Sequence, residues 1–149
     1  MNANLLRFFM NIWPPFIGAG IKIERLSQDY KNAVISLRMG LLNRNIVGVH
    51  FGGSLFAMTD PFFMIMVHHN LGRDYVVWDR AAKIDFIKPG KGKVRAQFEV
   101  STEQIEELRI AAADGKKTLR DFQVEIRDSS GELVAVVVKT LYVRMKRPT

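Results

Sequence analysis

The sequence predicts an α+β fold in which a curved antiparallel β-sheet wraps around one central apolar helix. One observation is a long segment, residues 53–69, that is apolar on every side of a helix and therefore predicts a buried helix. A second is a set of segments on both sides of it in which polar and apolar residues alternate, as they do in half-buried strands. A sheet wrapped around a wholly apolar helix buries both kinds of segment.

Length and composition limit the chain to one ordinary domain. Its 149 residues are 48% hydrophobic, enough for a buried core, and we expect residues 1–149 to form a single domain without linkers or repeats. The absence of cysteine excludes disulfides and thiolate metal ligands and argues against a secreted disulfide scaffold. No cluster of His, Asp or Glu has metal-ligand spacing, so we expect no metal site, and we expect a cytoplasmic location.

The net charge of +7 favours an anionic partner, such as nucleic acid, an acidic membrane or a phosphorylated small molecule, or else a simply solvated basic surface. Lys and Arg are spread along the chain rather than concentrated on one element with interleaved aromatics, so we expect no nucleic acid partner. No segment reaches the roughly 20 apolar residues that span a bilayer, so we expect no transmembrane segment.

The N-terminal residues predict a short helix, about residues 3–13. Their apolar positions repeat at helical spacing, and Pro14-Pro15 end the pattern. The segment lacks the basic start and the small-residue cleavage site of a signal peptide. We expect this helix to pack on the body of the protein, with peripheral membrane contact as the alternative.

Two strands follow the N-terminal helix, each with one buried face. Residues 21–24 and 33–39 alternate between apolar and polar side chains, and residues 29–32 form the turn between them. Residues 40–51 are expected to form a loop that leads into the central segment.

The central segment contains one carboxylate and one proline that do not suit a buried helix. Asp60 is the only ionisable residue from position 55 to position 67, and a charge in apolar surroundings is costly unless it is paired or hydrogen-bonded. Pro61 has no N–H for the carbonyl of Ala57, and it restricts the backbone of Asp60. We therefore expect a kink or local break at Asp60-Pro61, with helix on both sides.

The second half of the chain is mostly strand. The predicted strands cover residues 74–87, 93–100, 118–127 and 132–144. Ser101 and Gln104 form a capping box that begins a short helix between the second and third of these strands. Because residues 133–138 are apolar on both faces, we expect the last strand to be central in the sheet.

This order of elements resembles the hotdog fold, and specifically its phenylacetyl-CoA thioesterase-like branch. Thr59-Asp60-Pro61, with Asp74-Tyr75-Val76-Val77-Trp78-Asp79 after it, is similar to a bacterial hotdog group catalogued mainly as a domain of unknown function. The resemblance covers residues 21–144.

The motif of that branch is an Asn, a Gly three residues later, a His-Gly-Gly that opens the central helix, and an acid seven residues after the second Gly. The matching positions are Asn45, Gly48, Gly52, Gly53 and Asp60. Two departures accompany the match. Phe51 stands immediately before the glycines, with His50 one place earlier, and Pro61 replaces a more usual small residue.

The resemblance implies an acyl-CoA thioesterase with Asp60 as general base or nucleophile. Gly53, at the start of the helix, has an N–H that is one of the unpaired donors of the first turn and suits an oxyanion. Asn45 or His50 would hold the carbonyl or the water. No cofactor is implied, because coenzyme A is part of the substrate. Hotdog sites of this branch lie across a dimer interface, so a homodimer or a dimer of dimers is expected.

Substrate binding is expected at the glycine turn and at a basic turn that follows one of the strands. The implied positions are Gly52, Phe51, Lys88, Lys91, Lys93 and Arg95. The four basic residues would meet the phosphates of coenzyme A, as basic side chains do with phosphate generally. The alternative for them is a solvated turn.

Other interpretations of the same residues stay open. The chain is alternatively a non-catalytic acyl-CoA or fatty-acyl binding protein, or a dehydratase acting on acyl thioesters, which would need His50 to face a carboxylate. The two glycines can be a tight helix entry, and Asp60 can cap the second half of a broken helix. His50 can be an ordinary hydrogen-bonded loop residue.

Overall fold

Six strands form one antiparallel sheet in the computed structural model, which describes residues 2–146. The strands are β1 (Ile21–Leu26), β2 (Asn32–Arg38), β3 (Tyr75–Phe86), β4 (Lys93–Glu99), β5 (Thr118–Asp128) and β6 (Leu133–Met145). Their order in the sheet is β1-β2-β4-β5-β6-β3, so β1 and β3 are the edges. The predicted strands are confirmed, and β6 lies inside the sheet as its two apolar faces indicated.

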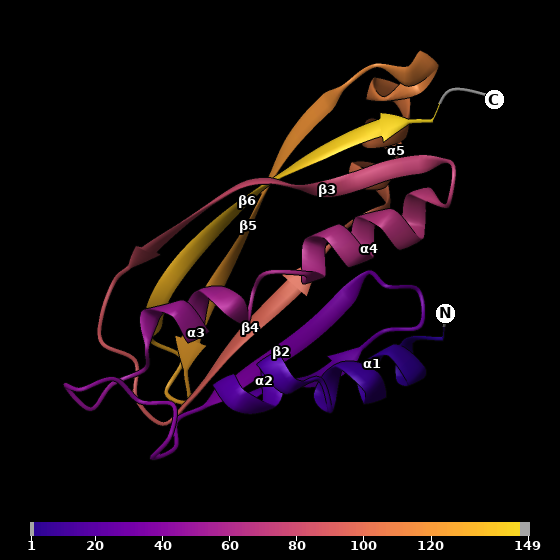
Figure 1. The fold of residues 1–149 in the computed structure, drawn as a ribbon. Coiled ribbons are helices and arrows are strands. Elements are labelled where there is room, and N and C mark those ends of the chain that lie inside the picture. The colour runs from indigo at the N-terminus through magenta and orange to yellow at the C-terminus, as the bar shows by residue number, and fades with distance from the viewer. Residues whose placement is uncertain (1, 147–149) are drawn as a thin grey trace.

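The predicted central helix is present as two helices that lie across one face of the twisted sheet (Figure 1). They are α3 (Gly52–Ala57) and α4 (Phe62–Leu71). Between them the backbone hydrogen bonds join residues three apart, as in a 3₁₀ turn. The N–H of Thr59 donates to the carbonyl of Phe56, and the N–H of Asp60 donates to that of Ala57. The break expected at Asp60-Pro61 is therefore confirmed.

Aromatic side chains of α4 form the centre of the core. The centroid of the Phe63 ring lies 5.0 Å from that of Phe98 on β4 and 5.0 Å from that of Phe122 on β5. Phe62 packs on the same Phe98 ring at 5.2 Å. Burying a side chain of this size contributes about 1.5–3 kcal/mol, so α4 is held to the sheet chiefly by apolar packing.

Two short helices, rather than one, precede β1. They are α1 (Ala3–Asn11) and α2 (Pro14–Ala19). The sequence pattern ended the N-terminal helix at Pro14-Pro15, but these prolines begin α2. The first turn of a helix tolerates proline because its N–H groups have no intrahelical partner there.

Polar side chains of α1 close the exposed edge of the sheet. The Asn11 side-chain amide donates to the carbonyl of Ile23 at 3.2 Å and accepts from the N–H of Ile23 at 2.7 Å. Arg7 donates to the carbonyl of Glu24 at 3.0 Å. The polar side of α1 is thereby used on β1, and Phe8 and Phe9 remain exposed. The helix packs on the body of the protein, as its sequence predicted.

The remaining helix covers the end of α4 and precedes the last hairpin. It is α5 (Thr102–Ala111), followed by the short 3₁₀ turn η1 (Ala113–Gly115). Both hydrogen bonds of the predicted capping box between Ser101 and Gln104 are present. Across residues 2–146, none of these helices has the length and apolar character needed to cross a bilayer.

Replacing Asn11 with alanine should lower the free energy of unfolding by about 1 kcal/mol, because two hydrogen bonds to the backbone of β1 are lost at a site that water can reach. Urea denaturation followed by circular dichroism measures the change. Asn4→Ala in the same helix is the matched control, since within the described residues the Asn4 side chain makes no hydrogen bond. Equal loss in both variants would contradict this role of Asn11.

Candidate active site

Asp60 lies in the turn between α3 and α4 and contacts a lysine from the middle of the sheet. Its Oδ1 accepts a hydrogen bond from Lys139 Nζ at 2.9 Å. The Asp60 side chain is 61% exposed, whereas the Lys139 side chain is 1% exposed. Asp60 does not cap α4, since the N-cap of that helix is Pro61 and no side chain caps it. The carboxylate in the apolar segment therefore has an ionic partner rather than a capping role.

A second carboxylate shares the same lysine. Asp79 Oδ1, on β3, lies 3.2 Å from Lys139 Nζ, and the Asp79 side chain is 25% exposed. Burial raises the pKa of Asp79, and the neighbouring Lys139 partly opposes that rise. The ring of Phe56 on α3 lies 5.7 Å from the same ammonium. Three elements thus meet around one buried cation.

Lys139 and Asp79 were not predicted as site residues, although the sequence carries a signal for both. Lys139 follows an apolar run on β6, two positions from Val137 and Leu141, which are buried. Period-two alternation therefore places it on the inward face. Asp79 stands two positions after Val77, also buried. Two ionisable residues at inward positions of neighbouring strands predict a buried ion pair.

Asp60 and Gly53 line one cavity of about 280 Å³. Its walls are otherwise uncharged and mainly apolar, and come from α2, α3 and the residues around them. They are Trp13, Pro15, Phe16, Phe56, Ala57 and Pro61. Gly53 lies in the first turn of α3, and a β-carbon there would collide with the ring of Phe51. The cavity thus presents one carboxylate to a pocket suited to an apolar group.

Asn45 and His50 line a different cavity, of about 360 Å³, together with Gly52. The Asn45 side chain accepts from the N–H groups of Val47 and Val49, both at 3.1 Å, and so shapes the loop before α3. Within one chain, the predicted site residues are therefore divided between two cavities, Asp60 with Gly53 and Asn45 with His50.

His50 is buried and bonded to the backbone. Its Nε2 lies 3.0 Å from the carbonyl oxygen of Gly92, and its backbone N–H donates to Gly90 at 2.9 Å. Its Nδ1 is buried and has no hydrogen-bond partner among the described residues. Burial lowers the pKa of His50, and the contact with Gly92 partly opposes this. The ring is thus held neutral beside the basic turn.

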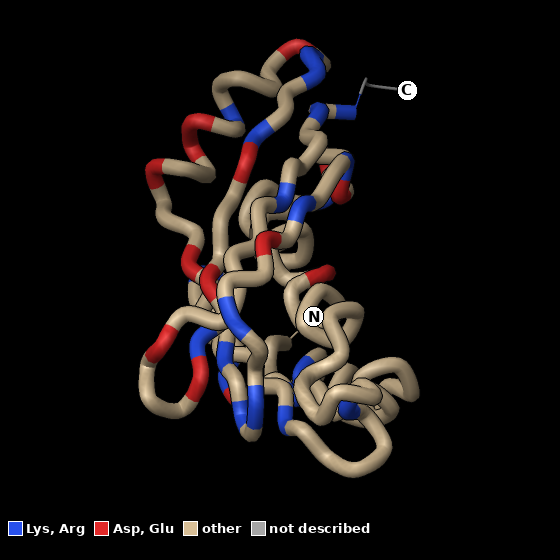
Figure 2. The backbone as a smooth tube through the Cα atoms, turned by 90° about the vertical axis from the view of Figure 1, so that its left-hand side faces the viewer, with Lys and Arg blue, Asp and Glu red and all other residues tan. Residues whose placement is uncertain are grey.

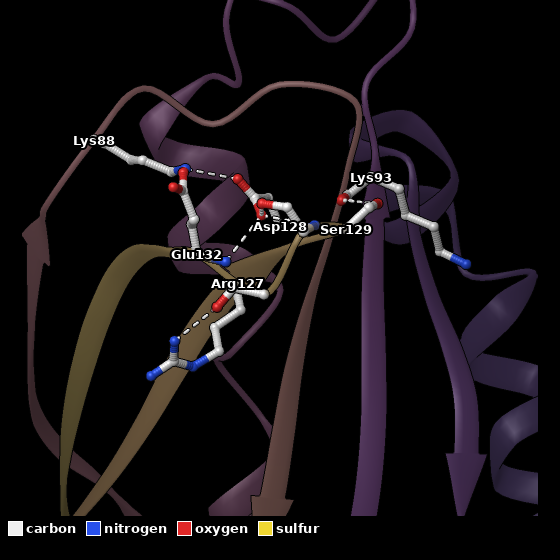
Figure 3. Close-up of polar contacts among 8 residues, drawn as sticks. Lys88, Lys93, Arg127, Asp128, Ser129 and Glu132 are labelled. Atoms are coloured by element: carbon white, nitrogen blue, oxygen red, sulfur yellow. Dashed lines mark hydrogen bonds and ion pairs between the residues drawn. The ribbon is translucent and has the colours of Figure 1, made fainter.

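Three of the four basic residues expected at the coenzyme A phosphates form ion pairs. Lys88 reaches Asp128 at 2.7 Å and also contacts Glu132, as Figure 3 shows. Lys93 contacts Glu24, and Arg95 lies 2.9 Å from the same carboxylate. These residues are therefore largely neutralised where they stand.

The carboxylate of Glu24 is strongly held by its partners. Burial alone would raise the pKa of Glu24, but hydrogen bonds from Lys93, Arg95 and Ser36 lower it to about 2. Lys91 is exposed and, within residues 2–146, takes part in no ion pair. Figure 2 shows Lys and Arg distributed over several strands and loops of the chain.

Two further residues have simple placements. Phe51, expected to bind substrate, is 57% exposed at the N-cap of α3 and is not among the residues that line the two cavities. His69, at the end of α4, stacks on Tyr30 with ring centroids 3.8 Å apart. Among the described residues, no three His, Asp or Glu side chains gather in a way that could hold a metal ion.

The sheet and its broken central helix define a hotdog-fold protein, and solved structures share the architecture. A Pseudomonas aeruginosa protein of unknown function, described as a probable thioesterase, superposes with a TM-score of 0.85 at 20% identity, covering 97% of each chain. The Escherichia coli PaaI protein, from the phenylacetic acid degradation operon, gives 0.65 at 18% identity over 97% of this chain and 92% of its own. A Haemophilus influenzae thioesterase gives 0.71 at 16% identity with the same coverages.

Residues 2–143 match the family described as "Domain of unknown function (DUF4442)", and the chain belongs to this family. This match confirms, at the level of the family, the resemblance to a domain of unknown function that the Thr59-Asp60-Pro61 motif indicated. No protein of the curated set matches the sequence significantly.

The ring of His50 should titrate with a midpoint below 6.5 in the folded protein, because burial disfavours its charged form. The unfolded chain takes up the proton at a higher pH than the folded chain. His50 therefore supports stability above pH 6.5, and that contribution is lost as the pH falls through the lowered folded value. An NMR titration of the imidazole signals, assigned with the His50→Gln variant, measures the midpoint. A midpoint at or above 6.5 would contradict it.

Proposed function

We propose that the protein hydrolyses acyl thioesters, with an acyl-CoA as substrate and Asp60 as the general base or nucleophile. The observation that carries the proposal is the single carboxylate of Asp60 in an otherwise uncharged cavity that also contains Gly53. The Pseudomonas aeruginosa and Haemophilus influenzae proteins of the same fold, described as a probable thioesterase and a thioesterase, support this class of reaction.

The chemistry follows from the groups at this cavity. As a general base, Asp60 takes a proton from a water whose oxygen attacks the thioester carbonyl carbon. As a nucleophile, its oxygen attacks that carbon directly and forms an anhydride, which water then cleaves. In either route the C–S bond breaks and coenzyme A leaves as the thiol after taking a proton. The N–H of Gly53 is the proposed donor to the oxyanion, a contribution that typically reaches about 100- to 1,000-fold in rate.

Substrate binding divides between the cavity and the surface. The acyl group occupies the pocket between Trp13, Phe16 and Phe56, whose rings offer apolar contact. Lys91 is the strongest candidate for a phosphate of coenzyme A, because it is exposed and has no ion-pair partner among the described residues. Lys88, Lys93 and Arg95 would first have to exchange a carboxylate partner for a phosphate.

A homodimer completes this proposal. The edge strand β3 (Tyr75–Phe86) is largely exposed over 12 residues, and an uncovered edge of that length is suited to pairing with another strand. Pairing through β3 would also allow the Asn45 cavity of one chain to approach the Asp60 cavity of its partner. Light scattering coupled to gel filtration should give a mass of at least two 17.0 kDa chains. A mass of one chain at micromolar concentration would contradict the dimer.

The Asp60→Asn variant should lose thioester hydrolysis by about 100-fold or more, because the amide can neither accept the proton nor attack the carbonyl. Thiol release from a panel of aliphatic and aromatic acyl-CoA substrates, with the product mass determined in parallel, measures the reaction. Glu106→Gln is the matched control, since Glu106 is an exposed carboxylate on α5 that pairs with Arg109 on the surface.

Each alternative has a distinct outcome in that experiment. Unchanged turnover in Asp60→Asn would remove Asp60 from the reaction. Stable acyl-CoA binding without any thiol release would indicate a binding protein. Loss of water from the acyl group with the thioester intact would indicate a dehydratase.

A further inference from the structure

We infer that Lys139 is a positioning residue for Asp60, holding one carboxylate oxygen so that the other serves the reaction. This inference rests on the proposed function. Lys139 Nζ donates to Asp60 Oδ1 at 2.9 Å, which leaves Oδ2 as the oxygen for a water or a thioester carbonyl. Lysine is almost never fully buried unless it is paired, so its 1% exposure needs an explanation.

The direction of the hydrogen bond favours Asp60 over Asp79 as the functional partner. Both carboxylates lie near the ammonium, but only the contact with Asp60 has hydrogen-bond geometry. Asp79 Oδ1 is 3.2 Å from Nζ and yet has no hydrogen-bond partner among the described residues. Asp79 therefore contributes mainly charge to the cluster, while one N–H of the Lys139 ammonium donates to Asp60, the carboxylate that lines the cavity.

The placement of the lysine suits a positioning role. Lys139 lies on β6, which is hydrogen-bonded to β5 on one side and β3 on the other. Asp60 lies in the short turn between α3 and α4, where its N–H donates to the carbonyl of Ala57. The ammonium therefore ties a turn residue to a strand that is paired on both sides.

Among the described residues, the ion pairs of this cluster bring charged groups from two strands to Asp60. They are Lys139 from β6 and Asp79 from β3, and the other described residues that line the cavity from α2 and α3 are uncharged. Removing the ammonium would leave two carboxylates without a cation between them. A variant of Lys139 alone would therefore combine two effects, the lost hydrogen bond to Asp60 and the uncompensated charge of Asp79.

A purely structural role for Lys139 would be to neutralise Asp79, and a double variant separates the two roles. In Lys139→Met with Asp79→Asn, both buried charges are removed together, so the demand for neutralisation disappears. If the role of Lys139 is only structural, this variant should have the turnover of the wild type. The positioning role predicts that it folds but that kcat remains about 100-fold low, the scale expected when a reacting group is misplaced by about 1 Å.

The experiment measures kcat and KM of thiol release for the wild type and four variants. They are the double variant, Asp79→Asn, Lys139→Arg and Asp60→Asn. Asp79→Asn should stay within a few fold of the wild type, because the bond between Lys139 and Asp60 remains. The double variant should lose kcat with little change in KM. Lys139→Arg should keep a larger part of the wild-type kcat than the double variant does, since a cation that can donate to Asp60 is retained.

Each result decides between the two proposals. Wild-type kcat in the folded double variant, with Asp60→Asn inactive, would overturn the positioning role and leave the thioesterase proposal intact. Full activity of Asp60→Asn would overturn the thioesterase proposal itself. If the double variant does not fold, Lys139→Gln with Asp79→Asn makes the same comparison with a polar side chain, and circular dichroism confirms its fold.

Discussion

Proline at position 61 removes one backbone donor from the longest apolar segment, and the arrangement of the site depends on that loss. In a continuous helix, the Asp60 side chain would lie in a row that faces either the core or the elements packed around the helix. The interruption instead ends α3 with tightened backbone bonds and restarts the helix at Phe62. Phe62 and Phe63 can then fill the core while Asp60, adjacent in sequence, reaches the cavity. One residue, Pro61, thus separates the side chains that pack in the core from the carboxylate that lines the cavity.

The same interruption permits a lysine to be buried inside the sheet. An unpaired ammonium in the core would be strongly destabilising, and Lys139 has two carboxylates within 3.2 Å. Removing the ammonium would leave both carboxylates without a cation, so the turn, β3 and β6 depend on one another. The break at Pro61 is thus both a local backbone effect and a condition for the electrostatics of the site.

The sequence predicted the strands, the capping box and the broken helix because alternation, capping residues and proline act locally. It predicted Asp60 as the functional carboxylate but not its partner, although the inward spacing of Lys139 and Asp79 was readable. The helix at Pro14–Ala19 was missed because two prolines and a glycine in six residues resemble a loop. The division of Asp60 and Asn45 between two cavities was beyond local patterns, because it depends on how distant segments pack.

Electrostatics also limits how the surface can recognise an anionic ligand. The net charge of +7 suggests a broad attraction, but Lys88, Lys93 and Arg95 are already paired with carboxylates. A phosphate approaching the basic turn must therefore compete with Asp128, Glu132 and Glu24 for these cations. Surface ion pairs of this kind are worth only about 0–1 kcal/mol, so a doubly charged phosphate can displace them at small cost. For the proposed acyl-CoA substrate, long-range attraction would then depend on net charge, while selectivity for the acyl group would depend on the apolar cavity beside Asp60.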